Sequence, residues 1–323
     1  MIYSIGEALI DMIPQQVGKS IRYVDGFSKQ AGGAPANVAA TIAKLGGNSA
    51  FVSKVGSDGF GRYIVDVLNN VGVDTSKVFY SDNKFTGIIY IATKEDGDRE
   101  FCASRQNSAD LYLDRNEIDE AWFTNKDILH FCSVSLVEAP VKYAHIKAIE
   151  SIIAKGGRVS FDVNLRLMLW EKKEDCIKTV WDFIKYPDYL KVSDDEVEII
   201  LNTNDYDMAV KQFFKAGKRL KFIIVSRGKD GSYIFFRNGI KHFVPAYSVN
   251  VVDTTGAGDC FIGSILYHLD NISCEPNEKD MLKILNFASA AAALEIGKIG
   301  AITSLPTLEE VINYLKVNSK DIY

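Results

Sequence analysis

The stretch VDTTGAGDCF, residues 252–261, places two glycines and an aspartate directly before an apolar run. Apolar residues with the spacing of one helix face follow at Ala257, Phe261, Ile262, Ile265, Leu266 and Leu269. The N-terminus of a helix exposes unpaired N–H groups and the positive end of the helix dipole. Glycines there let backbone amides approach an oxyanion without a Cβ in the way. The stretch therefore predicts an anion hole formed by residues Gly256, Ala257 and Gly258.

Asp259 is expected in the first turn of that helix, next to the anion hole. In this position it can take a proton from a hydroxyl group whose oxygen attacks the bound anion. The alternative is structural, because an aspartate in a first turn usually complements the helix dipole by about 0.3–1 kcal/mol. A carboxylate beside an anion hole is electrostatically unfavourable, and this favours the functional interpretation.

Around this motif, strand-like and helix-like segments alternate along the chain. RYIVDVLNNVG (62–72) and VKYAHIKAIESIIAKGG (141–157) have helical patterns. Short apolar runs typical of buried strands, each expected to precede a helix, are FVSKVG (51–56), DILHFCSVS (127–135), RVSFDVN (158–164), YLKVS (189–193) and KFIIVSRG (221–228). The start of the chain, residues 1–14, is expected to be the first strand. This alternation predicts an α/β fold with a mostly parallel sheet covered on both faces.

Two inserts break the alternation, at about 12–30 and 86–104. The second insert predicts a β-hairpin whose turn contains Asp96 and Gly97. Together the inserts predict a small antiparallel sheet that covers one end of the main sheet. No stretch is long and polar enough to be an interdomain linker, so residues 1–323 are expected to form a single domain.

Composition limits the partners. The 323 residues are 47% apolar and 24% charged, as in a globular protein with a sizeable core, and the net charge of −5 disfavours nucleic acid. Five scattered cysteines without a CxxC pair indicate a reducing compartment. No uncharged apolar run approaches the roughly 20 residues of a membrane span, and residues 1–14 lack a basic leader. We therefore expect a cytoplasmic protein with no nucleic-acid or membrane partner.

A second glycine cluster, GGAPANVAATIAKLGG (32–47), predicts another helix that begins near Gly33 and Pro35. Asn37 would lie near its start on an otherwise apolar helix, where an unpaired amide is costly to bury. Either the side chain makes a local cap or turn contact, or it binds a polar ligand with hydroxyl groups. The residues alone leave both possibilities open.

GGAPANVA (32–39) with KVGSDGFG (54–61), and DTTGAGDCF (253–261), resemble the two signatures of the ribokinase-like (PfkB) carbohydrate kinases. The resemblance extends from Gly6 to about Pro306. It implies a three-layer α/β/α sandwich with a β-sheet lid, formed by the two inserts, that often also makes a dimer contact. It also implies phosphate transfer from ATP to a sugar hydroxyl.

The resemblance assigns roles to individual residues. Asp259 matches the catalytic base, and the amides of residues 256–258 match the anion hole for the transferred phosphate. The residues that match sugar contacts are Asp11, Gly32, Gly33 and Asn37. Those that match the nucleotide site are Lys191, Ser226, Gly228, Gly231 and Ser289. Glu196 matches a residue that holds Mg²⁺ through water, and a K⁺ site in many members matches Asp253, Thr255, Gly300 and Ser304.

This chain departs from the family pattern at two positions. Ser193 stands where members often have the asparagine of an Asn-x-x-Glu motif, which leaves that contact near the metal and phosphates open. Ser289 stands where many members carry asparagine or histidine near the adenine, so the preferred nucleotide stays open.

RVSFDVNLRLMLW (158–170), with Asn164 and Arg166, resembles the fructokinase branch, and Arg105 matches an arginine presented to substrate. Without the family, a surface ion pair is the commoner role for an arginine. The 2-keto-3-deoxygluconate kinases commonly place a tyrosine two residues before that arginine, where this chain has Ala103. The resemblance therefore implies phosphorylation of the 6-hydroxyl of D-fructose. The alternatives are a 2-keto-3-deoxygluconate kinase, a nucleoside kinase, or a sugar or nucleotide sensor that has lost catalysis.

Overall fold

The computed structural model describes residues 1–16, 18–93, 99–272 and 275–318. Over these residues, the main sheet consists of β1 (Ile2–Ile5), β4 (Ser49–Gly56), β5 (Asp74–Ser81), β8 (Ile128–Cys132), β9 (Arg158–Asp162), β10 (Tyr189–Ser193), β11 (Phe222–Ser226), β12 (Ser232–Phe236) and β13 (Lys241–Val244). Their order across the sheet is β13-β12-β11-β10-β9-β8-β1-β4-β5. The strands from β5 to β11 in this order are parallel to one another. At the other edge, β12 pairs with β11 in the antiparallel sense, and β13 pairs with β12 in the antiparallel sense.

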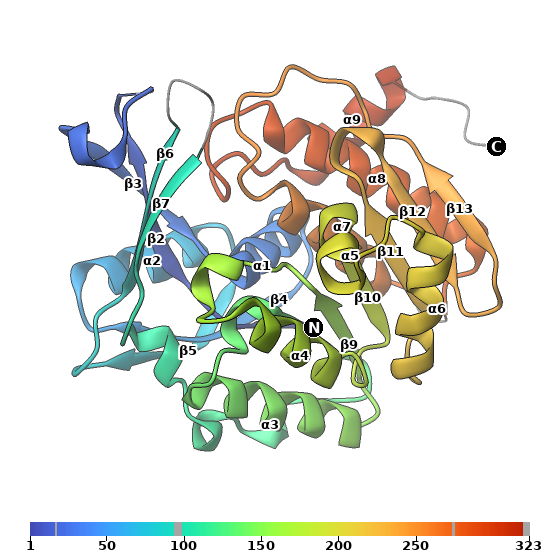
Figure 1. Ribbon diagram of the computed structural model, residues 1–323, viewed down its shortest axis with the longest axis horizontal. Coiled ribbons are helices and arrows are strands. Elements are labelled where there is room, and N and C mark those ends of the chain that lie inside the picture. Colours follow the sequence, from blue (N-terminus) through green and yellow to red (C-terminus); the bar gives the residue numbers. More distant parts are fainter. Residues whose placement is uncertain (17, 94–98, 273–274, 319–323) are drawn as a thin grey trace.

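Helices cover both faces of this sheet (Figure 1). On one face pack α3 (Pro140–Ala154), α4 (Lys173–Phe183), α5 (Asp194–Leu201) and α6 (Tyr206–Ala216). On the other pack α1 (Ala34–Lys44), α2 (Gly59–Asn70), α7 (Ala257–Asp270), α8 (Glu278–Ile296) and α9 (Leu308–Asn318). Short 3-10 helices lie at Ile21–Tyr23, Ala109–Tyr112, Arg115–Glu117, Glu120–Trp122, Ser133–Ser135, Leu167–Leu169 and Gly228–Asp230. The predicted three-layer α/β/α arrangement is confirmed.

The central strands are mostly apolar because both of their faces are buried. In β8, Leu129 and Phe131 pack toward α3 and α4, while Ile128 packs toward α1 and α7. The chain runs outward from β1 to β5 with α1 and α2 on one face, and then from β8 to β11 with α3–α6 on the other. The change of direction falls between β1 and β8. Ligands of such sheets bind beyond the carboxyl ends of the strands, near this point.

A second sheet, which we call the lid sheet, consists of β2 (Leu9–Pro14), β3 (Phe27–Gly32), β6 (Gly87–Thr93) and β7 (Arg99–Ser104). Its strand order is β3-β2-β6-β7, and it stands at the left of Figure 1 in blue and cyan. The predicted hairpin is confirmed by the antiparallel pairing of β6 with β7. Its predicted turn residues, Asp96 and Gly97, lie outside the described residues.

Three details of the prediction are wrong. Residues 1–14 form two strands in different sheets, β1 and β2, because the chain leaves the main sheet at Gly6. The lid sheet is mixed rather than antiparallel, since β2 pairs with β6 in the parallel sense. KFIIVSRG leads to β12 and not to an α-helix, because one short 3-10 turn after β11 brings the chain back into antiparallel pairing.

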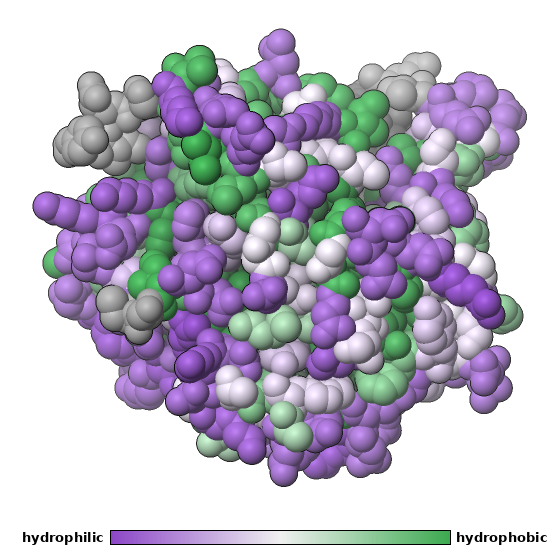
Figure 2. Space-filling view, turned by 180° about the vertical axis from the view of Figure 1, so that it is seen from behind, coloured by the Kyte–Doolittle hydropathy of each residue, from purple (hydrophilic) through white to green (hydrophobic). Residues whose placement is uncertain are grey.

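Within the described part of the chain, every helix is too short or too polar to cross a lipid bilayer. The face seen in Figure 2 carries hydrophobic residues in several separate groups, with hydrophilic residues between them.

Candidate active site

The N-terminus of α7 is formed by the glycine motif. Gly256 caps the helix with a φ of 92°, a left-handed conformation that suits glycine. A Cβ on Gly256 would lie 3.0 Å from the Cβ of Ala301, and one on Gly258 would lie 3.4 Å from Nζ of Lys191. The amides of residues 256–258 are thus at an open helix end beside a buried ammonium group. This arrangement is suited to an anion.

Asp259 lies in the first turn of α7, and only 7% of its surface is exposed. Its Oδ2 accepts a hydrogen bond of 2.8 Å from Nδ2 of Asn37, on α1. Burial, reinforced by the charge of Asp162, raises the pKa of Asp259 to about 7, against the lowering effects of Asn37, Arg166 and Lys191. A carboxylate whose pKa is near neutrality can both accept and release a proton under ordinary conditions.

Asn37 is buried and makes neither of the local contacts that the sequence left open as the structural alternative. Its amide nitrogen is used by Asp259, whereas its Oδ1 is buried without a hydrogen-bond partner. An unpaired buried acceptor is unfavourable. A hydroxyl group of a bound ligand would satisfy it.

Asp11 projects from the lid strand β2, and the two glycines predicted to bind sugar lie beside it. A Cβ on Gly32 would overlap Oδ2 of Asp11 at 2.1 Å. Gly33 has a φ of 109°, and a Cβ on it would clash with the carbonyl oxygen of Glu7 at 2.4 Å. Burial and the charge of Asp259 raise the pKa of Asp11 to about 7. The glycines therefore make room for this carboxylate and for the chain's return into α1.

Arg166 and Asn164 follow β9, at the carboxyl end of the main sheet. Arg166 is exposed, and its positive charge lowers the pKa of both Asp11 and Asp259. Asn164 is buried with a φ of 40°, and its carbonyl accepts a 3.3 Å hydrogen bond from Ser133. The structure thus brings Arg166 electrostatically close to the two carboxylates.

Lys191 and Asp162 form a buried ion pair on neighbouring strands, β10 and β9. Nζ of Lys191 lies 2.7 and 2.9 Å from the two carboxylate oxygens of Asp162. The charges of Asp162, Glu196 and Asp259 raise the pKa of Lys191 although burial opposes the rise. Asp162 was not predicted from the sequence. Its signal was a carboxylate ending an otherwise apolar strand at the edge where ligands bind.

Glu196 lies in the first turn of α5 as part of a capping box with Ser193. Its two carboxylate oxygens accept hydrogen bonds from the amides of Leu165 and Ser193, at 2.7 and 2.8 Å. Ser193 caps the helix by accepting from the amide of Glu196 at 3.2 Å. Glu196 therefore links the loop after β9 to the end of β10, and each of its carboxylate oxygens keeps lone pairs for a water molecule.

Apart from Lys191, the predicted nucleotide residues fall in two places. Ser226 ends β11, and the loop after it contains Gly228, with a φ of 49°, and Gly231, where a Cβ would lie 2.3 Å from the carbonyl of Val244. Ser289 lies on α8, and its hydroxyl is 3.5 Å from the carbonyl of Pro245. The first three residues thus lie at the turn between β11 and β12, whereas Ser289 contacts the loop that leads from β13 to α7.

The predicted K⁺ residues meet behind the loop that precedes α7. Asp253 accepts hydrogen bonds from the amides of Thr255 and Gly300, at 2.9 and 3.1 Å. The Ser304 hydroxyl contacts the Gly300 carbonyl, the Ala301 carbonyl at 2.9 Å and Oε1 of Glu295 at 3.2 Å. One hydroxyl proton cannot serve three acceptors. This excess of oxygen atoms fits a cation.

Glu295 was missed by the sequence analysis. It is fully buried in the last turn of α8, and its Oε2 has no hydrogen-bond partner. Burial, together with the charges of Asp259 and Asp253, raises its pKa to about 8. Its only sequence signal was a single acid in the alanine-rich run AAAALEIG (290–297).

Arg105 follows the last lid strand and is buried, not at the surface. Its Nε donates to Asp110 at 2.8 Å, its Nη1 to the Val134 carbonyl at 3.1 Å and its Nη2 to Ser135 at 3.2 Å. Both halves of the guanidinium thus have protein partners.

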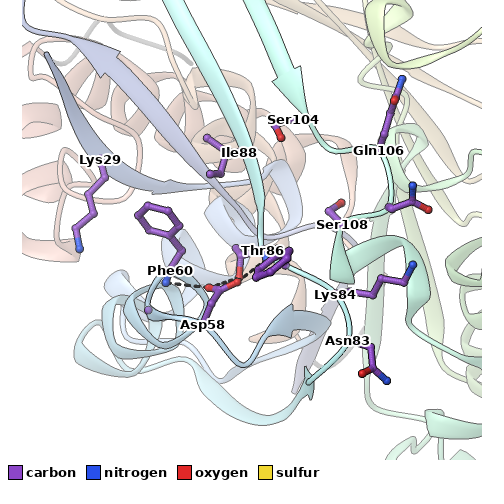
Figure 3. A pocket seen from close by; sticks show the side chains of 13 residues that line it. Lys29, Asp58, Phe60, Asn83, Lys84, Thr86, Ile88, Ser104, Gln106 and Ser108 are labelled. Carbon is purple, nitrogen blue, oxygen red and sulfur yellow. Dashed lines mark hydrogen bonds between the residues drawn. The ribbon is translucent and has the colours of Figure 1, made fainter. Parts of the chain in front are cut away.

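A cavity of about 890 Å³ lies beside the lid sheet, but it contains none of the predicted site residues. Figure 3 shows Lys29, Phe60 and Ile88 around it. By strand alternation Ile88 lies on the lid face opposite Ile89, which pairs with Asp11. The cavity is therefore separate from the cluster at α7.

A family model described as pfkB family carbohydrate kinase matches residues 1–308. Fructokinase-2 of Oryza sativa subsp. japonica is 38% identical over 311 residues, which cover 95% of this chain and 91% of the rice protein. The crystal structure of a fructokinase with bound ATP from Xylella fastidiosa has a TM-score of 0.89 and 31% identity, covering 99% of each chain. A double-mutant fructokinase from Vibrio cholerae O395, in a fructose-, ADP- and potassium-bound form, has a TM-score of 0.87 and 29% identity over 97% of each chain.

Proposed function

Because this chain belongs to the pfkB family of carbohydrate kinases and has the ribokinase-like fold, we propose that it is a fructokinase. The proposed reaction converts D-fructose and ATP into fructose 6-phosphate and ADP. The observation that carries the proposal is the buried Asp259 beside an open helix N-terminus, with Asn37 fixing one carboxylate oxygen. The similarity to fructokinases over nearly the whole chain supports the choice of sugar.

The chemistry follows from the positions of these groups. Asp259 takes the proton of the sugar 6-hydroxyl as the hydroxyl oxygen attacks the γ-phosphorus and the bond to ADP breaks. The amides of residues 256–258 stabilise the negative charge on the transferred phosphoryl group. Lys191, held by Asp162, adds a fixed positive charge next to Gly258. Asp11 and Asn37 bind sugar hydroxyls, and the loop with Ser226, Gly228 and Gly231 holds the nucleotide.

Two cations fit the residues present. Within the described residues no three acidic, histidine or cysteine side chains form a metal cluster, which suits Mg²⁺ held mainly by phosphates and water with Glu196 behind them. Bound Mg²⁺ would neutralise charge on the β- and γ-phosphates. The oxygen atoms around Ser304, with Asp253 nearby, would hold K⁺ and stabilise the anion-hole loop.

A neutral sugar fits this site better than a keto-acid. Ala103 pairs with Ile89, which in turn pairs with Asp11, so the three residues share one face of the lid sheet. Among the described residues paired at this level of the sheet, that face offers the carboxylate of Asp11, the amide of Gln30 and the small side chain of Ala103, and no cationic group. Arg105 has its guanidinium engaged by Asp110.

The test is a coupled assay for ADP across a panel of sugars, with the wild type and the Asp259→Asn variant. We expect fructose to be the preferred substrate and the variant to lose about 10²–10⁴-fold in turnover, typical for a missing general base. Folding stability should change little, because asparagine removes a desolvated charge and keeps the shape. Unchanged turnover in the variant would eliminate the proposed base.

The same assay separates the alternatives. Faster phosphorylation of 2-keto-3-deoxygluconate than of fructose would replace the proposed substrate with the keto-acid. Preferred phosphorylation of a nucleoside would assign the chain to that branch. Measurable ATP binding without ADP production from any acceptor would indicate a sensor.

A further inference from the structure

Over the described residues, the chain crosses between the main sheet and the lid sheet four times. The crossings lie at residues 6–8 between β1 and β2, at Gly33 between β3 and α1, at 82–86 between β5 and β6, and at 105–108 after β7. Asp11 is carried by the lid, whereas Asp259 belongs to the main body. The conformation of these crossings therefore sets how the two carboxylates face each other.

Two of the crossings meet at one hydroxyl group, that of Ser135, which follows β8, and Glu7 connects a third to them. Ser135 accepts from Nη2 of Arg105 at 3.2 Å and donates to Oε2 of Glu7 at 2.6 Å. The other oxygen of Glu7 accepts from the amide of Ala34, at 3.1 Å. One connected network thus joins the chain where it enters the lid sheet, where it returns into α1 and where it finally leaves.

The fourth crossing reaches the same network through Asp110. Asp110 forms a 2.7 Å ion pair with Arg105, and a Cβ on Gly87, the first residue of β6, would lie 3.5 Å from its Oδ1. The amide of Ala109 donates to the Phe85 carbonyl at 2.8 Å. Figure 3 shows Thr86 at this crossing, where its hydroxyl and amide both donate to Asp58, the cap of α2.

The network is buried, and it sets one guanidinium group against two carboxyl groups. Glu7, Arg105, Asp110 and Ser135 are each 5% exposed or less. Removing one partner of such a network leaves another buried charge or polar group unsatisfied. The buried partners therefore hold one another in defined positions. Because the planar guanidinium of Arg105 donates to three different acceptors, it fixes both the orientation and the separation of the segments that carry them.

We propose that Arg105 is a positioning residue. Together with Glu7 and Ser135, it fixes the position of the lid sheet, and therefore of Asp11, relative to Asp259. This role replaces the direct substrate contact expected from the sequence. Only the expected effect of this role on sugar phosphorylation rests on the proposed function. The placement of the lid is a property of the protein without ligand.

The test uses the full-length variants Arg105→Met, Arg105→Lys, Ser135→Ala and Glu7→Gln. Arg219→Met is the matched control, because it removes an arginine from an ion pair with Asp188 at the amino end of β10, away from the lid. Hydrogen exchange of residues 9–14 and 87–93 is measured without ligand. For the same variants, the rate of sugar phosphorylation and the rate of ATP hydrolysis are measured in two independent assays.

We expect at least about tenfold faster exchange in the lid sheet of the Met, Ala and Gln variants, with little change in β9 and β10. Turnover should fall by up to about 10²-fold, the effect of misplacing a reacting group by about 1 Å. A larger share of ATP should be hydrolysed without forming sugar phosphate. Lysine at position 105 keeps the charge without the fork and should restore part of both properties, while Arg219→Met should resemble the wild type.

A different pattern would overturn the proposal. If Arg105→Met raises only the KM for sugar, while Ser135→Ala is silent in exchange and turnover, Arg105 contacts the substrate. If the Met variant does not fold, Ser135→Ala and Glu7→Gln decide the question by the same measurements. If no sugar is phosphorylated by the wild type, the proposed function fails, and faster exchange confined to the lid would still support the positioning network. Exchange that is uniform across both sheets would exclude it.

Discussion

At the scale of single residues, the proton affinity of Asp259 is set by opposing neighbours. Burial and Asp162 favour the neutral acid, while the Asn37 amide, Arg166 and Lys191 favour the carboxylate. The result is a pKa of about 7 in the folded protein, above the ordinary value for an aspartate. Because the proposed base must be ionised to accept a proton, kcat/KM should rise with pH through about pH 7.

The Asn37→Ala variant should move this acid limb to higher pH. It removes a hydrogen bond to the charged form, worth about 1.5–3 kcal/mol, and so raises the pKa of Asp259 by about one unit or more. The measurement is the pH profile of kcat/KM for the preferred sugar. Thr41→Val is the control, since it removes a buried hydroxyl one turn further along α1 that contacts only the Asn37 carbonyl. An acid limb at the same pH in Asn37→Ala and wild type would contradict the assignment.

At the scale of elements, the N-terminus of α7 combines three features that depend on one another. The left-handed cap at Gly256 turns the chain, the loop behind it is held by Asp253, and the amide of Ala257 makes a long hydrogen bond of 3.4 Å to the Thr254 carbonyl. Helix α8 supplies Glu295 behind the same loop. A change that alters the cap geometry therefore changes the direction of the amides as well as stability.

The Gly256→Ala variant should lose turnover beyond its loss of stability. Alanine in a left-handed conformation costs about 1–2 kcal/mol, and its Cβ would lie 3.0 Å from that of Ala301. Displacing one donor of an anion hole costs about 10²-fold or more in kcat. Thermal unfolding and kcat are measured for this variant and for Gly59→Ala, whose Cβ would meet nothing within 4 Å at the start of α2. Equal kcat in the two variants would argue against the anion hole.

At the scale of the whole molecule, the site lies between two sheets. The main sheet supplies Asp162 and Lys191, α7 on its face supplies the helix terminus, and the lid sheet supplies Asp11. Bound sugar would contact both, so it should couple the lid to the main body. The predicted dimer contact through the lid stays a prediction.

Sugar binding should therefore slow hydrogen exchange selectively in β2 and β6. At a sugar concentration of about 100 Kd, an opening that releases the sugar is disfavoured by about 2.7 kcal/mol, or roughly 100-fold. Strands β12 and β13, at the far edge of the main sheet, serve as the internal control. The measurement uses the sugar that supports turnover, with and without nucleotide. Protection spread equally over both sheets would show that the lid does not close on the sugar as an element.

Much of this protein is determined by the sequence itself. Strand and helix periodicity predicts the parallel sheet with helices on both faces, since those patterns depend on local burial. The motif at residues 252–261 predicts a helix terminus suited to an anion, because glycine freedom and the helix dipole are local properties. It also places Asp259 in the first turn. The family resemblance then indicates the residues that surround it.

Only the tertiary structure decides how distant residues meet. The bond from Asn37 to Asp259 joins residues 222 positions apart, and the pair of Lys191 with Asp162 depends on the register of β10 against β9. The buried position of Arg105, and the division of residues 1–14 between two sheets, likewise depend on where the chain crosses to the lid. Charge, burial and hydrogen bonding at these sites are set by groups far away in the chain. The local sequence pattern does not show which residues far apart in the chain become neighbours, because that is decided only when the chain folds.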